Sequence, residues 1–413
     1  MPPEDSAPVP PRSANSIGFL RVVLAAMVIY THAHYLGGFA EEPLMRWTHG
    51  ALSAGTLAVQ CFFVLSGWLV ASSWLRLQSG PAFLWHRILR LGPGFWVCLI
   101  VTAALFGPLI HWTSPTPRGA YLALEPSAPG YVWHNLLQPR AQISIGDLTA
   151  HTPRPGDLNG SLWTLFYEGA CYLAVVVCGL MARLGRRGRY AFAVLAGVLL
   201  VAHPFARAGF LPAGVLRLFD TPGKIMCWHF ATGMACAVFP SLTPWMGRQP
   251  WPALAGFAAL MAAWRLGCSE IVSPFALPPV LFWLAERLPV RNWERRVGGD
   301  YSYGLYVYGY PVQQLLAHWG AHRLGLAAFM FLGLLTAGAF AWLSWQFVEE
   351  PALRLRHAFS ARDRNRTQSL CPSFRPYCRS SSPRTIRIPG GCSGRLRVCG
   401  PRPCGRPNGK PSL

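Results

Sequence analysis

The sequence predicts an all-α protein, a polytopic membrane bundle of about ten transmembrane helices with both termini in the cytoplasm. The first observation is composition: 52% of the 413 residues are hydrophobic and only 13% are charged, whereas charged residues make up about 25% of a soluble domain. The second is that the apolar residues occur in runs long enough to span a bilayer. The third is the placement of arginine between those runs, which predicts their orientation.

Ten segments have about the 20 mostly apolar residues that a membrane helix needs. They are 17–36, 52–74, 91–113, 161–182, 190–206, 218–240, 251–267, 270–288, 300–320 and 325–348. The start of the chain, MPPEDSAPVPPRSANS, is polar, so we expect no cleavable signal peptide. The predicted organisation is a cytoplasmic segment over 1–16 and a membrane domain over 17–351.

Arginines cluster after the second, fourth, eighth and tenth segments and are sparse in the odd-numbered loops. The clusters are Arg76, Arg87 and Arg90; Arg183, Arg186, Arg187 and Arg189; Arg287, Arg291, Arg295 and Arg296; and Arg354 and Arg356. Because short cytoplasmic loops are rich in Arg and Lys, these loops and both termini are predicted to be cytoplasmic. The one long connection, 114–160, is then external.

The net charge of +21 does not predict a nucleic-acid partner. Residues 361–413 hold twelve Arg or Lys against one acid, so about half of the excess lies in a short tail rich in Pro, Ser, Gly and Cys. Such a composition does not form a core, so we expect 352–413 to be a basic, disordered cytoplasmic tail or a translated frame error. The twelve cysteines show no paired metal-site spacing, and no metal is predicted.

The first segment, FLRVVLAAMVIYTHAHYL, contains three ionisable residues at membrane depth, where such residues are costly and mark candidate functional sites. Arg21 and His32 are eleven residues apart, which places them on one helix face and ~16 Å apart along the axis. His34 points to the opposite side and is interpreted as an interfacial residue. Arg21 and His32 are therefore the candidate pair.

Two further segments contain candidate polar residues. In WHRILRLGPGFW, Arg87 and Arg90 have the i, i+3 spacing of one helix face, which suits phosphate groups, although topology alone also explains two arginines there. In SLWTLFYEGACYL, Glu168 lies two turns inside its segment. It is predicted either to pair with Arg21 or His32 or to orient a catalytic imidazole.

The segment DYSYGLYVYGYPVQQ has five tyrosines and is interpreted as a cavity wall that presents hydroxyl groups. Small residues in CFFVLSGWLV, Ser66 and Gly67, favour close helix packing or substrate contact. Neither interpretation identifies a substrate.

Six motifs in order make the chain resemble the membrane acyltransferase family 3, whose members move acyl groups onto bacterial surface carbohydrates. They are Arg21/His32, FFVLSG at 62–67, Arg87/Arg90, SLWTLxxE at 161–168, SYGLYxYGYPV at 302–312 and VEEP at 348–351. The resemblance implies that His32 is the catalytic residue with Arg21 as its companion, and that Arg87 and Arg90 are associated with the acyl donor. We further predict that Glu168 assists His32, and that Ser302 and Tyr306 bind substrate together with Arg21, Arg87 and Arg90. One departure is Gly309, where many members have histidine.

The resemblance implies an O-acyltransferase of the bacterial cytoplasmic membrane without a fused soluble catalytic domain. Its expected co-substrate is acyl-CoA, in the form of acetyl-CoA, with no permanently bound cofactor. The acceptor is a hydroxyl of a surface or exported carbohydrate, and the partners are the lipid bilayer and polysaccharide-biosynthesis proteins. His32 would act as general base in direct transfer, or through an acyl-imidazole.

Two other functions remain open at this point. A transporter or flippase of glycan intermediates would use buried Arg, His and Glu as a relay or substrate site, although the two halves of the chain show no repeat of the kind common in transporters. An inactive scaffold in a polysaccharide-assembly complex is the third possibility.

Overall fold

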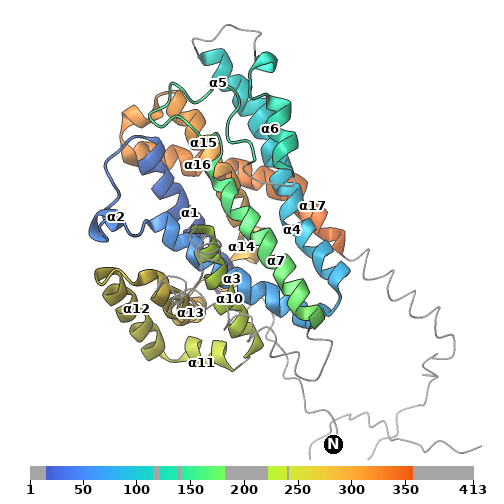
Figure 1. Cartoon of the computed structure of the whole chain (residues 1–413), viewed down its shortest axis with the longest axis vertical. Coiled ribbons are helices and arrows are strands. Elements are labelled where there is room, and N and C mark those ends of the chain that lie inside the picture. The colour runs from blue at the N-terminus through green and yellow to red at the C-terminus, as the bar shows by residue number, and fades with distance from the viewer. Residues whose placement is uncertain (1–14, 115–120, 137–140, 182–221, 240, 357–413) are drawn as a thin grey trace, which may run out of the picture. The chain divides into compact units, whose positions relative to one another are not determined.

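The structure, a computed structural model, describes residues 15–114, 121–136, 141–181, 222–239 and 241–356 (Figure 1). All regular secondary structure in these ranges is helical, which confirms the all-α prediction. The predicted segment 190–206 and most of the basic tail lie outside the described residues.

The longer helices follow the apolar segments of the sequence, and shorter helices lie between them. The α-helices are α1 (Ile17–Leu36), α2 (Pro43–Trp47), α3 (Ala54–Leu77), α4 (Gly80–Val101), α5 (Gly107–Thr113), α6 (Ala128–Asn135), α7 (Trp163–Met181), α10 (Pro222–Val238), α11 (Leu242–Arg248), α12 (Pro250–Arg265), α13 (Ser269–Arg287), α14 (Trp293–Val297), α15 (Ser302–His318), α16 (Leu326–Ser344) and α17 (Glu350–Arg354). The π-helical turns η1 (Thr102–Phe106) and η6 (Trp345–Glu349) join α4 to α5 and α16 to α17.

Five of these helical runs are long and apolar enough to cross a membrane, within the described part of the chain. They are Ile17–Leu36, Ala54–Leu77, Gly80–Thr113, Gly160–Met181 and Leu326–Arg354. The pair Ile225–Val238 and Leu242–Arg248, bent by 99°, adds a sixth if it is one broken span. The predicted segment 218–240 coincides with α10, the first helix of this pair, and three more predicted segments coincide with α12, α13 and α15. The number of ten spans and the cytoplasmic placement of the termini stay predictions.

The expected start of the third segment, residue 91, is wrong. The helix begins eleven residues earlier, at Gly80, with Pro81 in its first turn, where proline is well tolerated. Pro93 lies inside α4 without ending it, as neighbouring helices allow in a membrane bundle. Arg87 and Arg90, which were counted with the arginines that follow the second segment, therefore lie within α4, where their predicted i, i+3 spacing on one helix face applies.

Small residues allow α3 to approach α10 closely. A Cβ on Gly67 would clash with the carbonyl oxygen of Phe230, and a Cβ on Gly233 would clash with that of Val64. Gly67 thus serves close helix packing, one of the two roles considered for it. Figure 1 shows α11, α12 and α13 grouped beside this α3–α10 pair.

Helix α1 packs against α15 and α16 as well as against α3. Ala25, Ile29, Ala337 and Ala341 are completely buried in this contact. The α1–α15 packing also accounts for Gly309, because a Cβ there would lie 2.8 Å from Cγ1 of Ile29. A larger residue at this position would require the Ile29 side chain to shift.

Several helix ends meet at one end of the bundle, which we call the proximal end. The Ser16 hydroxyl, just before α1, donates to the carbonyl of Leu288, just after α13, at 2.8 Å. The Arg287 side chain donates to the carbonyl of Arg248, which ends α11, at 3.1 Å. By contrast, Thr113 at the end of α5 meets His318 at the end of α15, which marks the opposite end.

Much of the long connection between α5 and α7 is folded onto the core. Tyr131, Ile145 and Leu158 are completely buried against α4 and α15, and the Gln314 amide donates to the carbonyl of Asp157 at 2.9 Å. Its predicted external location stays a prediction.

Candidate functional site

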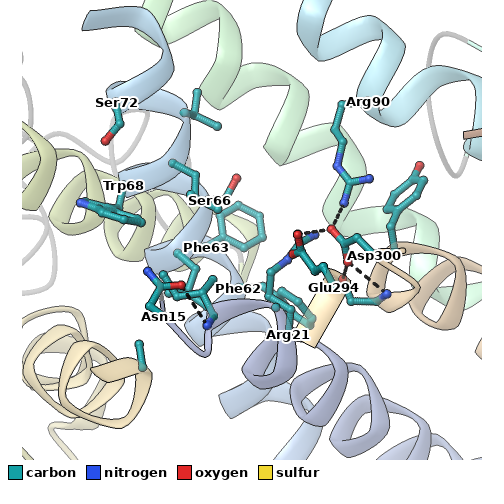
Figure 2. A pocket seen from close by; sticks show the side chains of 18 of the residues that line it. Asn15, Arg21, Phe62, Phe63, Ser66, Trp68, Ser72, Arg90, Glu294 and Asp300 are labelled. Atoms are coloured by element: carbon teal, nitrogen blue, oxygen red, sulfur yellow. Dashed lines mark hydrogen bonds and ion pairs between the residues drawn. The ribbon is translucent and has the colours of Figure 1, made fainter. Parts of the chain in front are cut away.

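A cavity of ≈ 970 Å³ lies between α1, α3, α4, α7 and the start of α15 (Figure 2). This is close to the upper limit of the roughly 300–1,000 Å³ usual for small-molecule sites. Its wall includes six of the seven predicted site residues: Arg21, Arg87, Arg90, Glu168, Ser302 and Tyr306. His32 does not line it.

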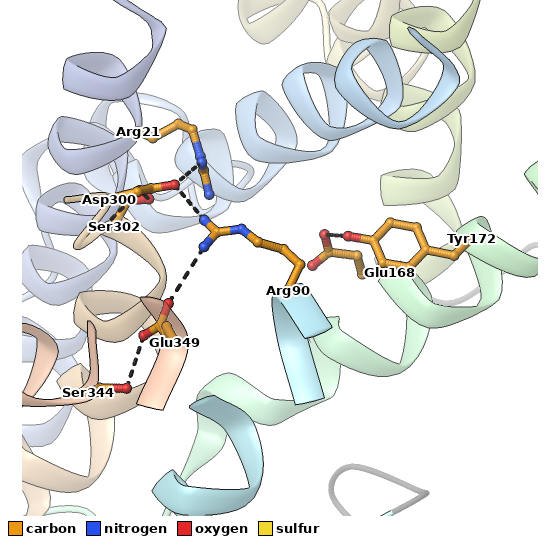
Figure 3. Close-up of polar contacts among 8 residues, drawn as sticks. All are labelled: Arg21, Arg90, Glu168, Tyr172, Asp300, Ser302, Ser344 and Glu349. Atoms are coloured by element: carbon orange, nitrogen blue, oxygen red, sulfur yellow. Dashed lines mark hydrogen bonds and ion pairs between the residues drawn. The ribbon is translucent and has the colours of Figure 1, made fainter. Parts of the chain in front are cut away.

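In the wall of the cavity, one carboxylate, Asp300, holds two of the predicted arginines (Figure 3). Oδ2 of Asp300 lies 2.5 Å from Nη1 of Arg21 and 2.5 Å from Nη2 of Arg90. Its Oδ1 accepts from the hydroxyl of Ser302 at 2.6 Å. Helices α1 and α4 and the start of α15 are thereby joined by charge-assisted contacts, which are stronger than neutral hydrogen bonds.

A second carboxylate extends this network. Oε2 of Glu349, in η6, lies 3.6 Å from Nη1 of Arg90, and its Oε1 accepts from Ser344 at 2.9 Å. The Glu349 side chain is only 2% exposed. Arg21, Arg90, Asp300 and Glu349 therefore form a buried cluster of two guanidinium groups and two carboxyl groups.

Asp300 precedes α15 and lies outside the five candidate spans. Burial alone would raise the pKa of its carboxyl, but Arg21 and Arg90 outweigh burial and hold that pKa well below its usual value of 3.8. The carboxylate is therefore ionised at neutral pH, as its two arginine partners require.

Sequence reasoning assigned no role to Asp300 or Glu349. Each lies next to a motif that was noticed: Asp300 stands two residues before SYGLY begins its helix, and Glu349 is the first glutamate of VEEP. The available signal was the excess of buried arginines over the single predicted carboxylate, Glu168, since buried cations need partners.

Arg87 has a different environment from Arg90. Its guanidinium lies over the rings of Phe83 and Tyr172, at 5.7 and 5.8 Å from their centroids, and makes one long contact of 3.5 Å with the Ser73 hydroxyl. Among the described residues no carboxylate oxygen lies within 4 Å of it, and its Nε is buried without a hydrogen-bond partner. Within the predicted Arg-x-x-Arg pair, Arg90 is thus paired with carboxylates, whereas Arg87 has no carboxylate partner among the described residues.

The predicted partners of Glu168 are wrong. Its carboxylate accepts from the Tyr172 hydroxyl at 2.5 Å and from the Ser66 hydroxyl at 3.1 Å, and these contacts involve neither Arg21 nor His32. Tyr172 lies one helical turn from Glu168 on α7, where i and i+4 side chains meet. Ser66 is therefore a cavity residue, unlike its neighbour Gly67.

Of the five tyrosines predicted to form a cavity wall, Tyr303 and Tyr306 line the cavity, whereas Tyr301, Tyr308 and Tyr310 do not. Tyr306 shares a hydrogen bond of 2.6 Å with Thr164, and Ser302 donates to Asp300 as described. Both side chains also line the cavity.

His32 lies on α1 beside Tyr310, with ring centroids 4.8 Å apart in an edge-to-face arrangement. Its Nδ1 is buried and has no hydrogen-bond partner among the described residues. The helical rise places it ~16 Å from the level of Arg21, toward the opposite end of the bundle. His34, by contrast, bonds through Nδ1 to the carbonyl of Ala40 at 2.7 Å.

A buried glutamate holds the helix turn that carries His32. Glu42, 2% exposed, accepts from the Thr31 hydroxyl at 2.5 Å and from the main-chain amide of Ala54. The Thr31 hydroxyl in turn accepts from the amide of Gly55 at 2.7 Å. Carboxylates are favourable at helix N-termini, so Glu42 joins the start of α3 to the end of α1. Sequence reasoning did not identify it.

The described residues contain no group of three or more His, Cys, Asp or Glu side chains arranged to hold a metal ion.

Comparison with known proteins gives a family match and several relatives. Residues 15–345 match the model of acyltransferase family 3, described as an acyltransferase domain. An O-acetyl transferase of Shigella phage Sf6 is 28% identical over 357 residues, covering 82% of this chain and 95% of the relative. Nodulation protein 10 of Rhizobium leguminosarum bv. viciae is 27% identical over 379 residues, covering 84% and 95%. No solved structure matches.

Proposed function

The chain belongs to acyltransferase family 3 and is an enzyme that transfers acyl groups. On this basis we propose its acyl group, its donor and its acceptor. The proposed reaction moves an acetyl group from cytoplasmic acetyl-CoA to a hydroxyl of a surface or exported carbohydrate. The relative named an O-acetyl transferase supports acetyl transfer to oxygen. The proposed location is the bacterial cytoplasmic membrane, where polysaccharide-biosynthesis proteins would supply the acceptor.

The observation that supports this proposal most strongly is the cavity that brings six predicted residues together around an available guanidinium. Arg87 has no carboxylate partner in the described structure, so its planar donors suit a phosphate group. Arg90, the residue one turn away, is occupied by Asp300 and Glu349. In this proposal Arg87 binds the diphosphate of CoA, and Arg90 positions the helix.

The length of the donor matches the separation between the arginines and His32. About twelve bonds link the phosphate-bound oxygen of pantetheine to its thioester sulfur, and at the reach of an extended peptide such an arm spans about 14 Å. Arg21, which shares Asp300 with Arg90, lies ~16 Å below His32 along α1. An arm of this length extends from a diphosphate at the level of the arginines most of the way toward His32.

At His32 the acceptor hydroxyl would give its proton to the imidazole as its oxygen attacks the thioester carbonyl carbon. The carbon–sulfur bond then breaks, the ester forms and the proton passes from His32 to the CoA thiolate. Transfer through an acyl-imidazole on His32 requires the same residue. Glu168 is not bonded to His32 and is proposed to hold Tyr172 beside Arg87 in the donor-binding wall.

The test is transfer by the purified protein from labelled acetyl-CoA to extracted glycan. The proposal predicts label in the glycan, released as acetate by mild base because the product is an ester. Label that remains in acetyl-CoA while glycan crosses a proteoliposome membrane would instead indicate a flippase. The absence of both activities from protein that elutes as a folded particle would indicate a scaffold.

A further inference from the structure

Four exposed arginines from separate parts of the chain line the proximal side of the same cavity. Arg76 stands one residue before the end of α3, Arg248 ends α11, and Arg291 and Arg295 lie between α13 and α15. We call them the rim arginines. The contacts that define the proximal end also join the elements that carry them, because the Arg287 side chain on α13 bonds to the main chain of Arg248.

The rim arginines have unused binding capacity, unlike the neutralised arginines deeper in the cavity. None of the four forms an ion pair within the described residues; Arg291 donates at 3.1 Å to the main-chain carbonyl of Glu286. Two carboxylates, Glu286 and Glu294, also line this side. With Arg356 as a fifth lining arginine, positive groups remain in excess.

The geometry of the proposed donor leaves one anionic part for this region. If the thioester lies near His32 and the diphosphate near Arg87, the remaining ribose, its 3′-phosphate and the adenine extend toward the proximal end. A phosphate monoester is close to a dianion at pH 7, and arginine forks bind it with two parallel hydrogen bonds.

We propose that the rim arginines bind the 3′-phosphorylated nucleotide end of the CoA donor, which rests on the proposed function. The site would select free acyl-CoA over an acyl group on the phosphopantetheine arm of a carrier protein, since that arm has no 3′-phosphate. Arg296 offers a comparison, because it is exposed and adjacent to Arg295 but does not line the cavity. If these arginines only marked the cytoplasmic side of the membrane, substitution of Arg295 and of Arg296 would change donor use equally.

The experiment compares two donors on two proteins. Acetyl-CoA and acetyl-3′-dephospho-CoA are given to the wild type and to a variant with Arg76→Gln, Arg248→Gln, Arg291→Gln and Arg295→Gln. We expect wild-type kcat/KM to fall about tenfold or more without the 3′-phosphate, mainly through KM. The variant should lose the same factor with acetyl-CoA and treat both donors alike to within about twofold.

Single variants keep the test informative if the fourfold variant does not fold. Arg295→Gln should reduce the preference for the 3′-phosphate, and Arg296→Gln should preserve it. A wild type that uses both donors equally, or a fourfold variant that keeps the full preference, would overturn the proposal. A wild type that transfers acetyl from neither donor would instead overturn the proposed function itself.

Discussion

Asp300→Asn tests the central ionic network of the cavity. The substitution keeps the side-chain volume but removes the negative charge that Arg21 and Arg90 share at 2.5 Å, so that Glu349 alone faces two guanidiniums. Removing one partner from a buried ion pair costs about 3–5 kcal/mol, because the remaining charge is left uncompensated. At about 2 °C per kcal/mol, the smaller sensitivity expected for a large chain, the melting temperature should fall by about 6–10 °C.

The assay is thermal unfolding of the detergent-solubilised protein, followed by the loss of monodisperse protein after heating. Glu350→Gln is the matched control, because Glu350 pairs with Arg354 at 2.9 Å where both side chains are exposed. Such a pair contributes no more than about 1 kcal/mol, so this control should melt within about 2 °C of the wild type. If Asp300→Asn melts no lower than Glu350→Gln, the network does not stabilise the fold as described.

Three further predictions concern stability and positioning. Glu42→Gln should lose one of the two carboxylate contacts and lower the free energy of unfolding by about 1–3 kcal/mol. It should also reduce kcat without changing the KM for acetyl-CoA. The control Glu41→Gln, at an exposed position, should match the wild type in melting and kinetic assays. Gly67→Ala should cost about 1–3 kcal/mol through overpacking against α10, while Gly169→Ala, where a Cβ meets nothing within 4 Å, should not lower the melting temperature. The melting difference between the wild type and Asp300→Asn should shrink as the pH falls below 3.8 toward the lowered folded-state pKa of Asp300; a difference that grows on acidification over this range would contradict the ionised carboxylate.

Helix positions were predictable because apolar length is a local property. The segment 17–36 coincides with α1 to the residue, and the other predicted segments that lie within the described residues overlap helices. The start of α4 was missed because Arg87 and Arg90 were counted among the residues that follow the second segment, whereas the helix runs through them from Gly80. Arg87 and Arg90, whose spacing predicted one helix face, both line the cavity.

Partners were not predictable in the same way, because pairing depends on contacts between distant segments. Arg21 and Asp300 are 279 residues apart in the chain, and no spacing rule connects them. For the same reason Glu168 was assigned to His32 or Arg21, although its nearest partner, Tyr172, lies one turn away on its own helix. The division of Arg87 from Arg90 likewise depends on α15 and η6.

The proposal that His32 is the catalytic base is tested most directly by acetyl transfer from labelled acetyl-CoA to glycan with His32→Ala and His34→Ala. Both residues lie on α1 two positions apart, so the pair controls for helix disruption. We predict that His32→Ala abolishes transfer at normal protein level and with unchanged acetyl-CoA binding, while His34→Ala retains most of the wild-type rate. Normal transfer by His32→Ala would contradict the assignment of this histidine and the proposed path of the donor toward it.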